Sequence, residues 1–131
     1  MLLKKFSFSL LFLFVFFLSA SHVSAATYYI SPSGNDNNNG SQSTPFKTFQ
    51  KSISVLNPGD ILKVFPGTYN EKVTINKSGN ANNWIEISPV SGRPNLDANF
   101  NYLPLDIKGD YLKIIGLEIQ KGKNPGESDG Y

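Results

Sequence analysis

Short apolar runs recur along residues 60–119, and no other feature limits the possible folds of this chain as strongly. Each run is brief and rich in Ile, Val and Leu, and Gly, Asn, Pro and Ser separate one run from the next. The runs are ILKVF at 61–65, KVTI at 72–75, WIEI at 84–87, LPLDI at 103–107 and YLKIIGLEI at 111–119. This pattern predicts β-strands joined by tight turns.

Apolar and polar side chains alternate within each run, so a strand sends them to opposite faces. The side chains predicted to face inward are Leu62, Val64, Val73, Ile75, Ile85, Ile87, Leu105, Ile107, Leu112, Ile114, Leu117 and Ile119. Those predicted to face water are Lys63, Thr74, Glu86, Asp106, Lys113 and Glu118. Every run therefore offers one apolar face to a core.

The inward positions of different runs recur at a nearly constant offset of about 21 residues, a period typical of a solenoid, in which each turn of chain stacks on the last. The matching pairs are Val64 with Ile85, Ile85 with Ile107, Ile75 with Leu96, and Leu96 with Leu117. No segment here has a 3.6-residue period long enough for a crossover helix. We expect an all-β parallel solenoid; an antiparallel sandwich with short strands is the alternative.

Residues 1–25 have the layout of a secretory signal peptide. Lys4 and Lys5 precede an apolar block whose uninterrupted part is 10–18, and small residues follow at 24–26. A membrane-spanning helix needs about 20 apolar residues, so this block is too short for an anchor. We predict cleavage after Ala25 and a secreted protein, extracellular or periplasmic, that has no membrane attachment once the signal is removed.

Composition excludes several kinds of chemistry. Removing residues 1–25 leaves ten basic and ten acidic residues, so no charge excess favours nucleic acid or an anionic membrane as a partner. The chain has no Cys, and its one His, His22, lies in the predicted signal. Ser/His/Asp hydrolysis, Cys/His nucleophiles and zinc sites built on His or Cys are therefore excluded. Chemistry would depend on carboxylates, Lys, Arg93, Tyr or an oxygen-bound cation.

Residues 26–59 are predicted to precede the solenoid. TYYIS at 27–31 predicts a strand outside the 21-residue register, and the following Asn-rich loop holds Gly34 and Gly40, which permit positive φ. Residues 35, 37, 39 and 40 echo the spacing of a calcium loop. The first of them is not Asp and the twelfth position is Phe46, so the bidentate carboxylate of an EF-hand is lacking and we predict a structural loop.

A single amphipathic helix is predicted after this loop. Thr44 suits an N-cap and Pro45 the first helical position, and NPGD at 57–60 ends the helix. Its apolar stripe would be Phe46, Phe49, Ile53 and Leu56. We expect this helix to cap the open first turn of the solenoid.

Three stretches carry a resemblance to a known family. They are YYISPSGNDNNNGSQSTPFKTFQKSI from 28, PGDILKVFPGTYNEKVTI from 58 and YLKIIGLEI from 111. They resemble the N-terminal part of secreted right-handed parallel β-helix proteins of the pectate-lyase-like group of polysaccharide lyases. With the signal at 1–25, the predicted organisation is a strand, loop and cap helix at 26–59 and the first coils of a parallel β-helix at 60–131. Because no helix or polar capping segment follows the run at 111–119, we expect the chain to be the front end of a longer protein with further coils.

The resemblance implies β-elimination on a pectin-like acidic polysaccharide, with calcium bound in the full-length relatives. In that group the calcium carboxylates and the basic residue lie in central coils, and no position here matches a catalytic motif. We therefore assign no catalytic, cofactor-binding or metal-binding residue to this chain, predict no calcium bound by it, and expect this portion alone to be inactive.

Several side chains are weaker candidates whose simpler interpretation is structural. The charged candidates for lining a groove, whose simpler interpretation is a solvated outer face, are Lys63, Glu86, Asp106, Lys108, Lys113 and Glu118. Asp106 with Asp110, and Glu127 with Asp129, are carboxylate pairs for an oxygen-bound cation. Aromatic residues for sugar stacking, or for packing, are Tyr69, Trp84, Phe100 and Tyr102.

Three functions from different classes remain open at this point. The first is the N-terminal portion of a secreted β-helix polysaccharide-degrading enzyme whose substrate is bound by downstream coils. The second is a non-catalytic β-helix, either a surface adhesin or a glycan-binding scaffold. The third is a complete small carbohydrate-binding module with a sandwich fold.

Overall fold

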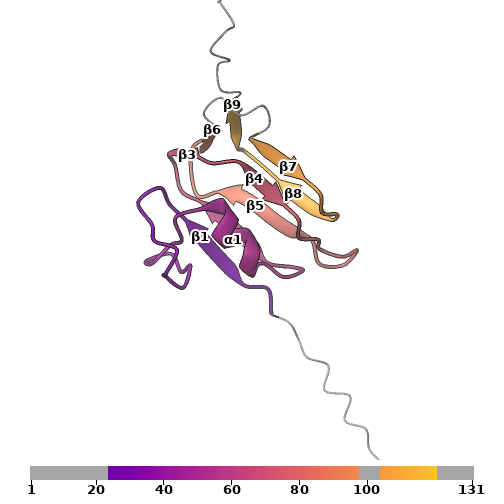
Figure 1. Cartoon of the computed structure of the whole chain (residues 1–131). Helices are drawn as coiled ribbons and strands as arrows, with labels where there is room; N and C mark the ends of the chain where they lie inside the picture. Colours follow the sequence, from indigo (N-terminus) through magenta and orange to yellow (C-terminus); the bar gives the residue numbers. More distant parts are fainter. Residues whose placement is uncertain (1–23, 98–103, 121–131) are drawn as a thin grey trace, which may run out of the picture.

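A computed structural model describes residues 24–97 and 104–120, and this part of the chain contains nine strands and one short helix (Figure 1). The elements are β1 (Thr27–Ile30), α1 (Phe49–Val55), β2 (Ile61–Val64), β3 (Thr68–Asn70), β4 (Val73–Ile75), β5 (Ile85–Pro89), β6 (Asn95–Asp97), β7 (Leu105–Ile107), β8 (Leu112–Ile114) and β9 (Glu118–Gln120). No helix in these residues is long and apolar enough to cross a membrane.

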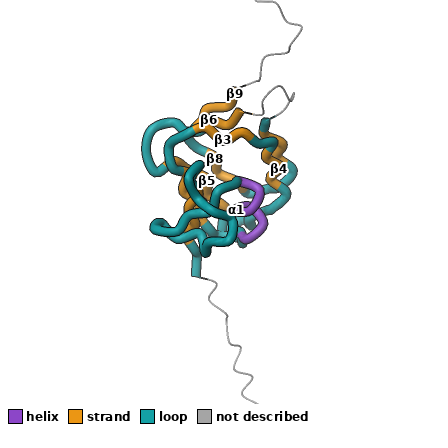
Figure 2. Tube along the Cα trace, turned by 60° about the vertical axis from the view of Figure 1, so that its left-hand side comes forward, coloured by secondary structure: helices purple, strands orange, loops and turns teal. Residues whose placement is uncertain are grey.

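The strands form three parallel sheets, and the chain passes from one sheet to the next as it winds. The sheet orders are β1-β2-β5-β8, β3-β6-β9 and β4-β7. One turn of chain supplies β2, β3 and β4, and the next supplies β5, β6 and β7, each directly beside its counterpart (Figures 1 and 2). All of these strand pairs are parallel, so the predicted solenoid is confirmed and the antiparallel sandwich is wrong.

The predicted 21-residue register, in contrast, is wrong. Val64 pairs with Pro89 and not with Ile85, and Ile75 pairs with Ile107 and not with Leu96. Ile75 and Leu96, which the sequence matched, lie in different sheets. All three sheets have inward apolar residues, so a constant sequence offset can match two residues that lie in different sheets and do not stack on each other. Because the turns between strands differ in length, the number of residues from one strand to the strand stacked on it also differs between sheets.

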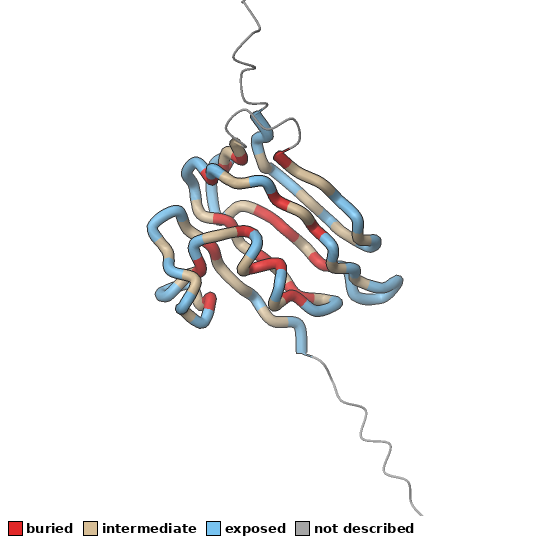
Figure 3. The backbone as a smooth tube through the Cα atoms, viewed as in Figure 1, coloured by how far each residue is buried: buried red, intermediate tan, exposed pale blue. Residues whose placement is uncertain are grey.

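Burial follows the order of the coils (Figure 3). The inward Leu, Val and Ile residues of β2, β4 and β5 are at most 1% exposed. Leu112 and Ile114 of β8 are half-buried, whereas Ile107 and Ile119 are about 50% exposed. Each apolar layer is covered by the layer that follows it, and within the described residues nothing stacks on β7, β8 and β9. The apolar column therefore ends in an exposed surface.

The helix begins later than the sequence predicts. Its N-cap is Thr48, whose Oγ1 accepts the Lys51 backbone N–H at 3.1 Å, and not Thr44. Phe46 is not helical, because its N–H donates to the Tyr29 carbonyl and its own carbonyl accepts from Ser31. All four residues of the predicted stripe are nonetheless buried. Helix α1 packs against β1 and β4 over the first coil, where a cap is expected.

Glycine in the loop before α1 has two different roles. Gly40 has φ of 78°, as predicted, but Gly34 does not have a positive φ. A Cβ on Gly34 would lie 2.0 Å from the carbonyl oxygen of Phe46, so this position needs glycine for a close backbone approach. The loop is thus pinned to the segment that leads into α1.

Candidate functional site

The outer face of the sheet β1-β2-β5-β8 carries a ladder of charged and polar side chains across three coils. Lys63 on β2 is the register partner of Ser88 on β5, and Glu86 on β5 is the partner of Lys113 on β8. The Lys63 Nζ donates to Ser88 Oγ at 2.9 Å, and Ser88 Oγ donates to Glu86 Oε1 at 2.9 Å. The Lys113 Nζ lies 3.0 Å from Glu86 Oε2.

Glu86 is the centre of this ladder. Its hydrogen bond from Lys113 is the largest cause that lowers its pKa, and the Ser88 hydroxyl and the charge of Lys63 act in the same direction. Both ammonium groups lie beside the same carboxylate, with Lys63 Nζ 3.8 Å from Glu86 Oε1. The ladder therefore pairs opposite charges across neighbouring strands.

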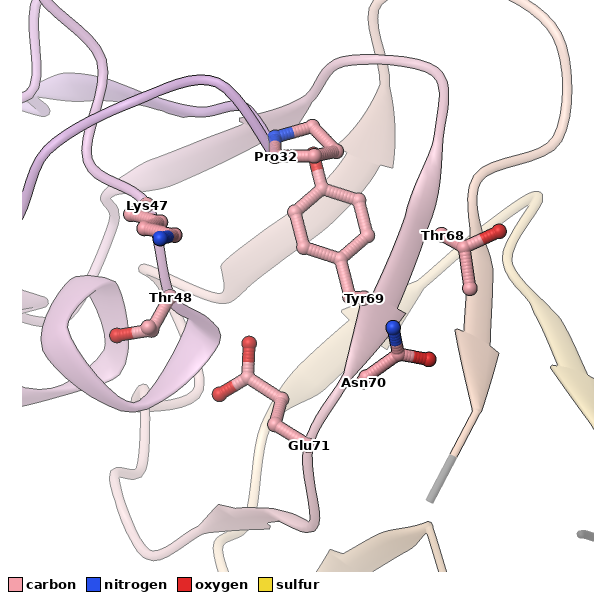
Figure 4. A pocket seen from close by; sticks show the side chains of 7 residues that line it. All are labelled: Pro32, Lys47, Thr48, Thr68, Tyr69, Asn70 and Glu71. Atoms are coloured by element: carbon pink, nitrogen blue, oxygen red, sulfur yellow. The ribbon is translucent and has the colours of Figure 1, made fainter. Parts of the chain in front are cut away.

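A pocket of about 360 Å³ lies between the first coil and the segment that leads into α1 (Figure 4). Its lining residues are Pro32, Lys47, Thr48, Thr68, Tyr69, Asn70 and Glu71. The Tyr69 hydroxyl donates to the carbonyls of Phe65 and Ile30, at 2.9 and 3.2 Å. Glu71 points toward the first turn of α1 and accepts the backbone N–H groups of Phe49 at 2.8 Å and Gln50 at 3.3 Å.

Two carboxylates hold the start of α1 from different loops. Asp36 accepts the N–H groups of Lys47 and Thr48 and the Thr48 hydroxyl, and these bonds together lower its pKa although burial, the largest single effect, opposes them. Burial raises the pKa of Glu71 and outweighs its two backbone N–H donors. Burial also raises the pKa of Tyr69. The pocket therefore lies between the cap and the first coil, and Glu71, the acidic residue that lines it, accepts backbone N–H groups of α1.

Asp106 and Asp110, one of the two carboxylate pairs proposed for an oxygen-bound cation, do not form such a site in the described structure. Asp106 lies 3.4 Å from the Lys108 Nζ, and Asp110 lies at the turn that enters β8. Within residues 24–97 and 104–120, no three acidic side chains come together as ligands. Asn35 and Asn39 accept backbone N–H groups of their own loop. Glu127 and Asp129 lie outside the described residues. The donor sets that the structure describes, Asp106 with Asp110 and the Asn-rich loop, do not fit calcium.

The aromatic candidates divide by exposure. Tyr69 is 3% exposed and packs edge-on against Phe49, with ring centroids 5.1 Å apart, so it is a core residue. Trp84 is 51% exposed. Phe100 and Tyr102 lie outside the described residues. Only Trp84 among the aromatic candidates that the structure describes is open to a ligand.

Sequence reasoning missed the residues that join the cap to the coil. Asp36 and Glu71 were part of the quoted stretches but received no role, and Asp60 was assigned only to the end of the helix. Asp60 is 2% exposed, and its carboxylate accepts the N–H groups of Ala26 and Asn57, each at 2.8 Å. A carboxylate beside Gly or Asn in a turn is the available signal, because such residues satisfy backbone donors that no strand pairs.

The chain is similar to a known protein family and to individual known proteins. The family model described as "Pel9A-like, right handed beta helix region" matches residues 28–128. Pectate lyase L of Dickeya dadantii (strain 3937) is 29% identical over 110 residues. This match covers 72% of the chain but 26% of that protein, so the chain spans about a quarter of the length of the curated relatives it matches.

Two solved structures extend the comparison. Pectate lyase Pel9A aligns with a TM-score of 0.59 and 28% identity, over 73% of this chain and 28% of its own. The GH136 lacto-N-biosidase from Eubacterium ramulus aligns with a TM-score of 0.68 and 22% identity, over 79% of this chain and 22% of its own. The second likeness shows the fold alone. The fold therefore carries more than one reaction type.

Proposed function

The chain belongs to the family of Pel9A-like right-handed β-helix regions, and from this membership we propose that it forms the N-terminal cap and first coils of a secreted polysaccharide-degrading enzyme of the pectate-lyase type. Its β-helix fold is similar to that of pectate lyase Pel9A, which supports the proposal. The reaction proposed for the whole enzyme is β-elimination on an acidic, pectin-like polysaccharide, and the substrate groove is assigned to further coils of the same polypeptide.

The exposed last layer of the apolar column is the observation that carries this proposal. Ile107 and Ile119 are register partners of Ile75 and Leu96, which are at most 1% exposed. One further coil would cover both exposed side chains in the same way. Strands β7, β8 and β9 each end a sheet and offer unpaired backbone groups to that coil. The repeated geometry favours a further coil of the same kind over any other cover.

The role assigned to this chain is to close one end of the solenoid and fix its register. Helix α1 buries Phe49 and Ile53 against the first coil, and the carboxylates of Asp36, Asp60 and Glu71 bind the backbone N–H groups of the cap. A closed first end prevents edge-to-edge association there. Each later strand then pairs against a preformed template.

Calcium is assigned to the further coils. Glu86 is paired with two lysines, and Asp36 and Glu71 accept backbone N–H groups, so no step of elimination is derived from these three carboxylates. When bound, the cation would neutralise the substrate uronate and acidify the proton that is removed. The segment 1–25 is assigned as a secretory signal because of its charge and apolar pattern.

The experiment compares two proteins from the same gene, the 131-residue chain and the polypeptide that continues past Tyr131. Both are incubated with polygalacturonate and calcium, and unsaturated uronide products are followed by their ultraviolet absorbance. We expect products from the longer protein and none from the chain. Turnover by the chain alone would show that the site assignment is wrong. A longer protein that folds but forms no product would favour a scaffold over a lyase.

A further inference from the structure

Asp60 is a buried carboxylate in the turn between α1 and β2, and it lacks a positively charged partner. Its residue is 2% exposed, and among the described residues ion pairs form at Glu86 and Asp106 and none forms at Asp60. Its Oδ1 accepts the backbone N–H of Ala26 and its Oδ2 accepts that of Asn57, each at 2.8 Å. Buried charges are normally paired, because burial without an opposite charge is unfavourable.

The backbone fixes the nitrogen of Ala26 beside this carboxylate. The ladder of β1 and β2 begins with Thr27 and Ile61, and it is extended by one hydrogen bond, since the Ala26 carbonyl accepts the Ile61 N–H at 2.8 Å. On the other side, the Asp60 carbonyl accepts the Glu86 N–H of the next coil at 3.0 Å. A separation of 2.8 Å between nitrogen and carboxylate oxygen is also typical of an ammonium group bound to a carboxylate.

This nitrogen belongs to the peptide bond at which the sequence predicts signal cleavage. Ala25 is exposed, whereas Ala26 is half-buried. Hydrolysis of the bond between them consumes one water and leaves a carboxylate on Ala25 and an ammonium group on Ala26, so atoms and charge balance. A free α-amino group titrates at about pH 8 and is therefore charged at neutral pH. Cleavage would create a positive charge on the atom that Asp60 already binds.

We propose that removal of residues 1–25 gives Ala26 an α-ammonium group that forms an ion pair with Asp60 and fixes the start of β1 to the first coil. A hydrogen bond between two charged groups is stronger than one from a neutral amide. Because Ala26 is only half-buried, the other ammonium hydrogens can reach water. This inference rests on the secretory signal proposed above and is independent of the lyase reaction.

The ion pair depends on which residue comes first. A chain that begins at Thr27 lacks the nitrogen that Asp60 binds. A chain that begins at Ser24 keeps the amide hydrogen bond, but its ammonium group lies two residues away. Only a chain that begins at Ala26 combines the hydrogen bond with the charge.

Chains with different first residues test the ion pair. One begins at Ala26 and one at Ser24, and each is released from an N-terminal fusion that leaves no added residue. In urea at about pH 7, we expect an unfolding equilibrium constant about tenfold smaller for the chain that begins at Ala26. Enzymatic acetylation of its α-amine keeps the N–H and removes the charge, so it should abolish this difference. Equal unfolding of the two chains, or a difference that survives acetylation, would overturn the proposal.

Asp60→Asn in both chains identifies the partner of the ammonium group. This variant keeps an acceptor oxygen without the charge, so the two first residues should no longer give different stabilities. Asp110→Asn removes the same charge from an exposed residue and is the matched control, in which the tenfold difference should remain. A difference that survives Asp60→Asn would overturn the pairing. Where Asp60→Asn does not fold, acetylation of the parent decides the question alone.

The first residue of the mature chain is checked by the mass of the protein that a secreting host releases when residues 1–25 are present. We expect a chain that begins at Ala26. A chain that begins at Thr27 would overturn this inference alone, whereas a chain that keeps residues 1–25 would also remove the secretory assignment. Neither result bears on whether the longer protein cleaves polygalacturonate, so the ion pair and the lyase function stand or fail separately.

Discussion

Ile75 and Ile107 are partners in the parallel ladder of β4 and β7, yet Ile75 is 1% exposed and Ile107 is 51% exposed. The two residues have the same side chain and face the same apolar column. The β7 layer covers Ile75, whereas no described layer covers Ile107. The difference in burial between the two residues therefore comes from stacking and not from the residue type.

The pair gives the first prediction. Ile75→Ala should lower the free energy of unfolding by about 2 to 5 kcal/mol, because it leaves a cavity in a packed layer. Ile107→Ala should lower it by less than about 1 kcal/mol, because the side chain is half exposed. Urea unfolding of the chain measures both. Equal losses would contradict the described order of burial.

Glu71 gives a prediction about pH. Burial raises the pKa of Glu71, so the folded chain binds its proton more tightly than the unfolded chain does. Stability from this group is full below the ordinary carboxyl value of 4.5 and is lost as pH rises through the folded pKa. Glu71→Gln cannot titrate and keeps one acceptor oxygen for α1, so it should lack this decline.

The measurement is urea unfolding of the parent and Glu71→Gln from about pH 4 upward. The difference in unfolding free energy between them should change in favour of the variant as pH rises. Asp36 acts in the opposite direction, because its pKa is lowered and its contribution is lost only as pH falls below 3.8. A difference in unfolding free energy that is constant with pH would exclude burial as the dominant influence on the pKa of Glu71.

The charged ladder on the outer face predicts that loss of Glu86 will create salt-dependent binding to an anionic polysaccharide. Glu86→Gln leaves Lys63 and Lys113 without their shared carboxylate, so the outer face gains free positive charge. Migration of this variant through a gel that contains polygalacturonate should be slowed at low ionic strength and restored at high ionic strength. Glu118→Gln removes the same charge from β9 and is the control. Equal retardation of both variants would attribute the effect to net charge alone.

A substitution at Gly34 should destabilise the fold through a steric clash and not through an unfavourable φ. Gly34→Ala places a Cβ 2.0 Å from the Phe46 carbonyl oxygen, so the loop must move away from the cap. Gly92→Ala meets no atom within 4 Å but has φ of 62°, so it should cost only about 1 kcal/mol. Thermal unfolding should show the larger loss for Gly34→Ala. The reverse order would contradict the close approach.

Strand positions and the inward pattern could be predicted because they depend on local alternation. Lys63 and Glu86 lie on the outer face, and Leu62, Val64, Ile85 and Ile87 are buried, as predicted. Strands β3 and β6 were not predicted. Each is three residues long with one inward apolar residue, Tyr69 or Leu96, which is too few for a period-two pattern.

The stacking register and the helix start could not be predicted because they depend on contacts distant in sequence. Phe46 suited a helical stripe, but its backbone pairs with Ile30 of β1, on the far side of the Asn-rich loop. The pairing of Glu86 with Lys113 follows from the length of the turns between β5 and β8, which no local pattern encodes. The contact between the Trp84 and Tyr111 rings, whose centroids are 5.8 Å apart, depends on the same register.

Disulfide trapping tests the stacking register most directly, since the chain has no cysteine of its own. Thr74 and Asp106 are register partners on β4 and β7, at a spacing between neighbouring strands that a disulfide can bridge. The double variant Thr74→Cys with Asp106→Cys should form an intramolecular disulfide under mild oxidation. Thr74→Cys with Asn95→Cys, which the 21-residue offset would join, should stay reduced. A disulfide in the second variant and none in the first would contradict the coil as described.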